Sequence, residues 1–234
     1  MIEFRSVSYA FEDVTVLEDV SLTIDDGEFV LLAGANGCGK TTLLRHCNGL
    51  LEPDSGEVLV NGTAVADDLI AARSSVGMVF QHPRDQFVSA TVGADVAFGP
   101  ENLGLPREEI DRRVTAALEA VNMTGREDDR IDTLSGGEQS RIAIAGALAM
   151  EPTHLVLDEP FTGLDDPARQ SVLDRLESLS ADGTGVLLAT HDLRDVCALA
   201  DRVIAMQAGR IAVDGPPATA LEELEGLEIR VPDL

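Results

Sequence analysis

The feature that most constrains this chain is a glycine-rich loop between an apolar segment and a helical pattern. The apolar run Phe29–Ala33 is followed by the residues GANGCGKT, which occupy positions 34–41, and apolar residues at helical spacing come next. The spacing G-x-x-x-x-G-K-T is that of a phosphate-binding loop, which joins a strand to the N-terminus of a helix. The loop therefore predicts an α/β fold with a mainly parallel sheet.

Each residue type in the loop has a physical reason. Gly34, Gly37 and Gly39 can adopt backbone angles that are closed to residues with a Cβ, so that successive N–H groups can turn towards phosphate oxygens. Lys40 adds a point charge, Thr41 offers a hydroxyl to Mg²⁺, and the start of the following helix favours an anion. Lys40 is also the only lysine among 17 Lys and Arg residues. A compact ammonium therefore occupies a place where a planar guanidinium would fit poorly.

The charge of the chain excludes some partners and indicates an unusual solvent. Asp and Glu total 42 against 17 Lys and Arg, and the resulting net charge of −25 is spread over the whole length. Duplex DNA and anionic lipid surfaces both need a basic footprint, so neither is expected as a broad-surface partner. We interpret the acidity as adaptation to molar intracellular salt, where repulsion is screened within about 3 Å. This interpretation indicates a halophilic source.

The cysteines and the apolar runs bear on the compartment. Cys38, Cys47 and Cys197 are odd in number and unpatterned, and no signal peptide is seen at the start, so a reducing cytosol is expected. The longest apolar runs, such as Ile142–Met150, are too short to span a bilayer. With 44% hydrophobic residues the chain can bury a substantial core.

Hydrophobic patterning predicts the elements around the loop. Alternation over Ile2–Phe11 and Val20–Ile24 predicts antiparallel strands with one solvated face, which form an N-terminal β subdomain. We treat residues 1–234 as a single domain with an inserted α-helical subdomain at about 85–150. The pattern also predicts a short strand within Pro53–Gly62 and buried strands at Val76–Gln81, His154–Glu159 and Gly185–Thr190. Helical stretches are predicted over Ala90–Thr124, clearest at Arg107–Val121 and with Gly104 and Pro106 as punctuation, over Ser140–Met150, from Pro167 to about Leu179, and near Ala218–Leu224.

Polar side chains stand at the ends of the predicted buried strands. Asp158 and Glu159 end one apolar strand, and because neighbours in a strand point to opposite faces, they are expected to have different surroundings. One carboxylate could hold hydrated Mg²⁺ while the other acts as a general base on water. Gln81 is either a loop amide without a role or a ligand to Mg²⁺ or the attacking water. His191 is either a satisfied structural residue or a contact to a γ-phosphate.

Two further motifs precede predicted helices, and one aromatic residue stands apart. The spacing of Ser and Glu in Ser135–Glu138 (SGGE) is that of a capping box, and a helix N-terminus with two glycines is also an anion site. Thr162–Asp165 (TGLD) is a tight turn with a carboxylate, and Pro167 starts a helix. Tyr9, the only tyrosine, either stacks on an adenine ring or is an ordinary residue of a half-buried strand.

The order of these motifs resembles that of the ATP-binding subunits of ABC transporters over nearly the whole chain. GANGCGKTT, Gln81, LSGGEQ, HLVLDE, TGLD and His191 occur in the family's order, and together they are highly specific. The resemblance implies a P-loop NTPase core and an ATP-sandwich dimer, in which the phosphate loop of one subunit faces the SGG motif of the other. Hydrolysis of ATP would then open the sandwich and move a membrane partner.

Residue roles follow from the resemblance, position by position. Asp158 orders Mg²⁺ together with Thr41, Gln81 senses the metal and water, Glu159 polarises the attacking water, and His191 contacts the γ-phosphate. Catalysis of this kind is chiefly positioning and charge stabilisation. The resemblance also makes Tyr9 the adenine-stacking residue and puts Asp165 at the dimer seam. The residues predicted to bind ATP are Tyr9, Gly34, Asn36, Gly37, Cys38, Gly39, Lys40, Thr41, Thr42, Ser135, Gly136, Gly137 and Asp165.

The segment that starts at Gln81, QHPRDQFVSATVGADVAFGPENLGLPREEI, resembles the energy-coupling-factor subgroup, whose ATPases drive uptake of vitamins or of cobalt and nickel ions. This implies a Mg²⁺-dependent ATPase on the cytoplasmic face of the cell membrane. Its expected partners are an identical or a second ATP-binding subunit, a transmembrane coupling protein and a substrate-binding membrane protein. His82 and Arg84 depart from the subgroup, which more often has Asn and Asp there, and Cys38 replaces a commoner Ser or Ala.

Several alternatives are weighed against this interpretation. A conventional ABC importer is the nearest one, and the cargo stays open among cobalt, nickel and a vitamin such as biotin. A non-transport ABC ATPase of chromosome maintenance or DNA repair would need a long coiled-coil insertion between the phosphate loop and LSGGEQ. Only about a hundred residues lie there, without heptads or a basic stripe. We therefore expect a transporter subunit that does not bind nucleic acid.

Overall fold

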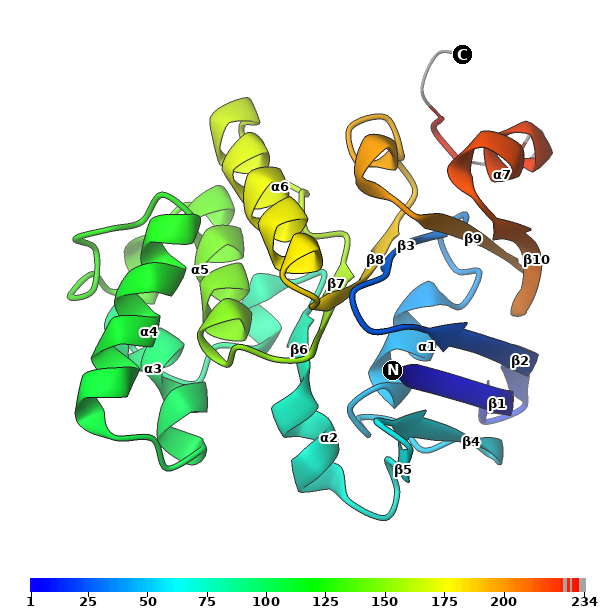
Figure 1. Cartoon of the computed structure of the whole chain (residues 1–234), viewed down its shortest axis with the longest axis horizontal. Helices are drawn as coiled ribbons and strands as arrows, with labels where there is room; N and C mark the ends of the chain where they lie inside the picture. Colours follow the sequence, from blue (N-terminus) through cyan, green and yellow to red (C-terminus); the bar gives the residue numbers. More distant parts are fainter. Residues whose placement is uncertain (225–226, 228, 232–234) are drawn as a thin grey trace.

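The fold consists of two β-sheets with helices between and around them (Figure 1). It is described by a computed structural model that covers residues 1–224, 227 and 229–231. In this part of the chain a four-stranded antiparallel sheet has the order β2-β1-β4-β5, and a six-stranded sheet has the order β10-β9-β3-β8-β7-β6. The strands are β1 (Ile2–Phe11), β2 (Val14–Ile24), β3 (Phe29–Ala33), β4 (Ser55–Val60), β5 (Thr63–Ala64), β6 (Val76–Val79), β7 (His154–Asp158), β8 (Gly185–Thr190), β9 (Arg202–Gln207) and β10 (Arg210–Gly215).

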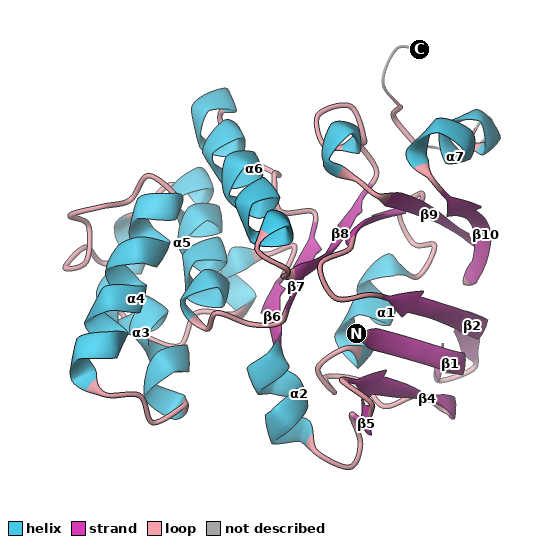
Figure 2. Cartoon of the chain, viewed as in Figure 1, coloured by secondary structure: helices cyan, strands magenta, loops and turns pink. Residues whose placement is uncertain are grey.

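Three of the helices form a group at one end of the larger sheet. Figure 2 shows α3, α4 and α5 together beyond the β6 edge of the larger sheet, on the side opposite to the antiparallel sheet. No helix among the described residues is long and apolar enough to cross a membrane. The α-helices are α1 (Lys40–His46), α2 (Leu69–Ser75), α3 (Val92–Asn102), α4 (Arg107–Ala120), α5 (Gly136–Ala149), α6 (Asp166–Ala181) and α7 (Pro217–Glu223).

Strand β3 divides the core into two layers because its side chains alternate between the faces of the sheet. Val30 and Leu32 pack in one apolar cluster with residues of α1 and the antiparallel sheet. Phe29, Leu31 and Ala33 pack in the other cluster, which contains residues of α3, α4, α5 and α6. A strand that is covered on both faces is apolar throughout, which explains the unbroken run before the glycine-rich loop. Helix α1 therefore lies between the two sheets, directly behind that loop.

The larger sheet aligns the ends of its parallel strands. Strand β8 runs parallel to both β3 and β7, and β7 runs parallel to β6. Ala33 at the end of β3 pairs with Thr190, and Asp158 at the end of β7 pairs with Ala189. The loops after these strands consequently leave the sheet at one edge, where α/β proteins bind their ligands. The predicted fold class is confirmed: an α/β core with a mainly parallel sheet, an antiparallel β subdomain and a helical part.

Some predicted boundaries were wrong, and the structure gives the reasons. Strand β2 begins at Val14 rather than Val20, because Val14 already pairs with Phe11 of β1. Helix α5 begins at Gly136 rather than Ser140, because the preceding residue caps it there. The helical pattern predicted over 90–124, with Gly104 and Pro106 as punctuation, is two helices, α3 and α4, that are separated at these two residues. Helix α2, β9 and β10 were not predicted, and the assignment of 1–234 to one domain stays a prediction.

Candidate functional site

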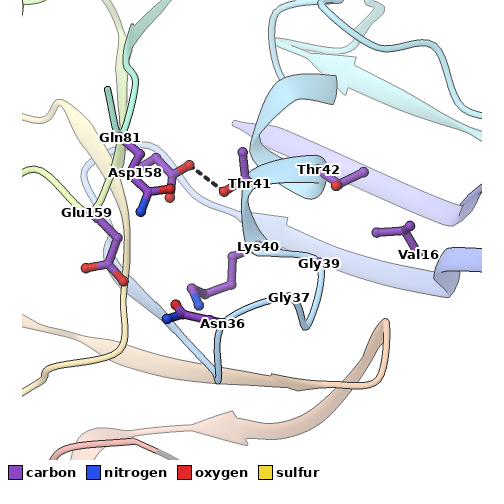
Figure 3. A pocket seen from close by; sticks show the side chains of 10 residues that line it. All are labelled: Val16, Asn36, Gly37, Gly39, Lys40, Thr41, Thr42, Gln81, Asp158 and Glu159. Carbon is purple, nitrogen blue, oxygen red and sulfur yellow. Dashed lines mark hydrogen bonds between the residues drawn. The ribbon is translucent and has the colours of Figure 1, made fainter. Parts of the chain in front are cut away.

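The loops after β3, β6 and β7 meet at a cavity of about 380 Å³ (Figure 3). Strand β2 contributes one residue to its wall, and the phosphate-binding loop and the start of α1 contribute most of the rest. We call this space the phosphate-loop cavity. It is lined by Val16, Asn36, Gly37, Gly39, Lys40, Thr41, Thr42, Gln81, Asp158 and Glu159.

The phosphate-binding loop wraps around the side chain of Lys40. The Lys40 ammonium donates to the carbonyl of Gly34 at 2.6 Å and to that of Ala35 at 3.2 Å. Close packing also requires a glycine at the start of the loop. A Cβ on Gly34 would lie 2.5 Å from Cys38 Sγ and 2.7 Å from the carbonyl oxygen of Met206. The loop is therefore built as the sequence motif predicts, with Cys38 as a buried filler beneath it.

A buried carboxylate faces the hydroxyl group that follows the loop lysine. The hydroxyl of Thr41 donates to Asp158 Oδ2 at 2.6 Å, and Asp158 is only 2% exposed. Burial raises the pKa of Asp158, and the neighbouring charge of Glu159 raises it further, while the hydrogen bond from Thr41 opposes the shift. Gln81 lies beside this pair in the same cavity (Figure 3). The three side chains offer the oxygen ligands that Mg²⁺ prefers.

Glu159 is held by the end of β8. Its Oε1 accepts from the backbone N–H of His191 at 2.9 Å and lies 2.7 Å from His191 Nδ1. Its Oε2 accepts from the hydroxyl of Thr190 at 3.0 Å. The backbone of Glu159 has a φ of 48°, in the left-handed region, so the chain turns sharply after β7. Asp158 and Glu159 therefore have different surroundings, as predicted.

The SGG motif forms the capped N-terminus of α5. Ser135 Oγ accepts from the Glu138 N–H at 3.3 Å, and the Glu138 carboxylate accepts from the Ser135 N–H at 2.8 Å, which confirms the capping box. These hydrogen bonds, with help from Arg126, lower the pKa of Glu138 to about 2. Gly137 packs on the turn before α6, since a Cβ on it would lie 2.7 Å from the carbonyl oxygen of Gly163. None of the SGG residues is among those that line the phosphate-loop cavity.

Two predicted binding residues outside the phosphate-binding loop and the SGG motif also lie apart from the cavity wall. Asp165 is the N-cap of α6, where its carboxylate accepts from the N–H of Ala168 at 2.9 Å. Tyr9 is partly buried on β1, and its ring packs edge-on against Phe11 and His46 at centroid distances of 4.9 and 5.1 Å. The roles of Tyr9 in adenine stacking and of Asp165 at a dimer seam stay predictions.

Sequence reasoning missed two residues of the site. Val16 lines the cavity next to Leu17, the residue that pairs with Tyr9 across the β1–β2 ladder. Nothing in its local pattern distinguishes it from other strand residues. Thr190 is 3% exposed and holds the Glu159 carboxylate. It could have been found as a hydroxyl residue at the end of a buried strand, immediately before His191.

Comparison with known sequences identifies a family. The sequence profile of the family described as ABC transporter matches residues 17–162. The chain is 65% identical over 232 residues to a Halobacterium salinarum protein described as an ABC transporter ATP-binding protein, with 99% of this chain and 100% of that one covered. It is 44% identical over 229 residues to an energy-coupling factor transporter ATP-binding protein of Methanothermobacter thermautotrophicus, with 96% and 74% covered.

Solved structures of ATP-binding subunits have the same fold. The cbiO1 protein of Clostridium perfringens, part of the ABC transporter complex cbiONQ, superposes with a TM-score of 0.82 at 35% identity and covers 96% of this chain and 91% of its own. A dimeric ATP-binding cassette in a post-hydrolysis state, bound to ADP and Pi, gives a TM-score of 0.84 at 28% identity, with 93% and 99% covered. Since the profile spans more than half of the chain and a relative matches its full length, this chain belongs to the ABC transporter family, as an ATP-binding subunit.

Proposed function

We propose that this chain is the ATP-hydrolysing subunit of an energy-coupling-factor importer, which takes up cobalt or nickel ions or a vitamin such as biotin. The observation that carries the enzymatic part is the meeting of Lys40, Thr41, Asp158 and Glu159 around one cavity. These side chains supply a cation for phosphate oxygens, two oxygen ligands for a metal, and a carboxylate for water. Phosphoryl transfer needs little more, because its catalysis is mainly positioning and electrostatic stabilisation.

Mg²⁺ would be held by Thr41, Asp158 and Gln81. The donor set fits the ion, because all three residues present oxygen atoms and Asp158 is buried beside the phosphate loop. When bound, the ion neutralises charge on the phosphates of ATP. Burial disfavours the ionised form of Asp158 and so raises its pKa. A divalent cation beside it would favour the ionised form.

Glu159 is the proposed general base towards the attacking water. Its carboxylate accepts hydrogen bonds from the Thr190 hydroxyl and the His191 backbone N–H, which orient it. His191 Nδ1 lies within hydrogen-bond distance of the same oxygen, and its backbone N–H already donates to that oxygen. The proposed contact of His191 with the γ-phosphate would thus make the position of the Glu159 carboxylate depend on whether the γ-phosphate is present.

A second subunit completes the site in this proposal. Ser135 and Gly136 are exposed at the N-terminus of α5, and they do not line the cavity of their own chain. A helix N-terminus favours anions, so these residues are suited to the phosphates in a neighbouring subunit. The dimeric cassette bound to ADP and Pi, which shares 28% identity, supports a dimer as such. The partner is either a second copy of this chain or a paralogous subunit.

The subgroup and the location rest on the relatives. The Methanothermobacter protein is named for an energy-coupling factor transporter, and the Clostridium structure belongs to a transporter complex. By analogy, we propose that this chain associates peripherally with the cytoplasmic face of the membrane. Its partners there are a transmembrane coupling protein and a substrate-binding membrane protein. The net charge of −25 and the relative from Halobacterium support a salt-adapted protein.

Co-purification tests the transport assignment. The tagged chain is purified from its own cell membranes in molar KCl, and the accompanying proteins and small molecules are identified by mass spectrometry. We expect a transmembrane coupling protein together with a small substrate-binding membrane protein, and a bound metal or vitamin would name the cargo. Recovery of ordinary permease subunits with a separate binding protein would leave the ATPase intact and replace the subgroup by a conventional ABC importer.

Replacement of Glu159 by Gln tests the chemical step. The amide keeps the size of the side chain and can still accept from Thr190, but it cannot take a proton from water. We expect Glu159→Gln to bind ATP, to accumulate as a dimer in light scattering, and to lose at least about a hundredfold in turnover. Retention of near-normal phosphate release would remove Glu159 from the role of general base.

A further inference from the structure

The last described residues of the chain return to the loop that carries His191. The backbone N–H of Arg230 donates to the carbonyl of His191 at 2.8 Å, and the N–H of Leu193 donates to the carbonyl of Arg230 at 2.8 Å. Asp192 and Arg230 thereby form a parallel β-bridge. Residues 229–231, which we call the C-terminal strap, thus add a short strand beside the residues that follow β8.

Apolar side chains hold the strap in place. Ile229 and Val231 flank Arg230 and are partly buried against the core cluster that contains Leu193 and Val196. The Arg230 side chain contributes less, because it is 66% exposed and its guanidinium reaches Asp192 only at 3.6 Å. Ion pairs of such exposure contribute little. The strap therefore acts on the loop through its backbone, and its alternating side chains supply the anchorage.

This contact fixes the peptide groups on both sides of one residue. On its N-terminal side, the N–H of His191 donates to Glu159 Oε1. On its C-terminal side, the carbonyl of His191 accepts from the strap. Both amide groups that flank the His191 Cα are thus hydrogen-bonded, one to the proposed base and one to Arg230 of the strap.

We propose that the C-terminal strap is a positioning element for hydrolysis, which holds His191 so that its backbone N–H and its ring orient the Glu159 carboxylate. The proposal rests on the function proposed above, because it assumes that Glu159 and His191 serve the hydrolysis of ATP. The strap contributes no residue to the phosphate-loop cavity, although Arg230 lines a neighbouring pocket with Glu159 and His191. It acts through the His191 carbonyl, so its loss should slow the chemical step and leave nucleotide binding by the phosphate loop intact.

A matched pair of substitutions separates the backbone from the side chain. Arg230→Pro removes the N–H that donates to His191 and keeps an extended conformation. Arg230→Ala keeps that N–H and removes only the exposed guanidinium. We expect Arg230→Pro to lower kcat for ATP about three- to tenfold, the size of one hydrogen bond, with KM unchanged. Arg230→Ala should have the same kcat and KM as the unsubstituted protein.

If the strap only stabilised the fold, the kinetic constants and the melting temperature would change in a different way. If Arg230→Pro lowers the melting temperature and alters kcat and KM together, the strap only covers the core and the proposal fails. It fails equally if kcat is unchanged. A chain that ends at residue 228 is the second variant, for which we expect a fall in kcat at least as large, again with unchanged KM.

Amide hydrogen exchange separates this proposal from the proposed function. The peptide that covers residues 190–194 should exchange faster in Arg230→Pro than in Arg230→Ala, because the hydrogen bond from the N–H of residue 230 to the His191 carbonyl is lost only in the former. Equal exchange in both variants would overturn the proposal even if the protein is a normal ATPase. If the unsubstituted protein does not hydrolyse ATP, the proposed function is refuted. The exchange data would still decide whether the strap holds the loop that carries His191.

Discussion

At the scale of single residues, function and stability conflict most strongly at Asp158. Its carboxylate is almost fully buried, and burial raises its pKa. A carboxyl group whose pKa is higher in the folded than in the unfolded state binds protons more tightly when folded, so it stabilises the protein at low pH and loses this contribution as the pH rises. At neutral pH the ionised Asp158 is therefore a cost to folding, retained in our proposal for Mg²⁺.

Asp158→Asn should therefore make the chain more stable and less active. Asn can still accept from Thr41, and it carries no charge to desolvate. We expect the free energy of unfolding at pH 7, measured by denaturant titration, to rise by roughly 0.5–2 kcal/mol, while Mg²⁺-dependent turnover is lost. Asp95→Asn is the matched control, because burial also raises the pKa of Asp95 but its partners are the N–H groups of Val88 and Ser89. Its turnover should be unchanged; a less stable Asp158→Asn would contradict the argument.

The sequence allowed the polar residues of the site to be predicted, but not their partners. Asp158, Glu159 and His191 stand out because each ends or follows an apolar strand. Which residue holds which depends on the strand order β3-β8-β7-β6, which no local pattern encodes. The bonds from Thr190 and His191 to Glu159 exist because β7 and β8 are neighbours in the sheet. The strap contact at Arg230 is equally non-local.

At the scale of elements, the N-terminus of α5 offers a test of the second subunit. A Cβ on Gly136 would meet nothing within 4 Å in its own chain, whereas a Cβ on Gly137 would lie 2.7 Å from the carbonyl oxygen of Gly163. We expect Gly136→Ala to leave the melting temperature and ATP binding unchanged and to lower ATP-dependent dimerisation and turnover at least about tenfold. Gly137→Ala should instead lower the melting temperature. Full turnover by Gly136→Ala would argue against a partner's phosphates at this position.

The strands whose bounds could be predicted are short, almost unbroken apolar runs. Strands β3 and β8 are buried throughout because both faces are covered, and their predicted bounds match the observed ones. The hairpin of β9 and β10 was missed. Its turn has positive φ at Ala208 and Gly209, a two-residue turn in which alanine is an unusual residue. β10 is an edge strand with mixed burial, so its pattern is weak.

At the scale of the whole molecule, the net charge of −25 makes the dependence of the fold on salt testable. Many arginines are already engaged locally, such as the exposed Arg112 with Glu109 and Glu151. Exposed pairs of this kind contribute little, and the excess carboxylates still repel one another over the surface. This repulsion opposes the compact state and the approach of a second acidic subunit alike.

We therefore expect both folding and turnover to require salt. The Debye length falls from above about 10 Å in 50 mM KCl to below about 3 Å in 2 M KCl, so repulsion is screened only in the latter. The urea midpoint and the rate of ATP hydrolysis should both rise between these two concentrations. Sucrose in 50 mM KCl is the control, because it is excluded from the protein surface but does not screen charge. A chain that folds and works equally well at both salt concentrations would disprove the salt adaptation; full rescue by sucrose would assign the effect to exclusion instead of screening.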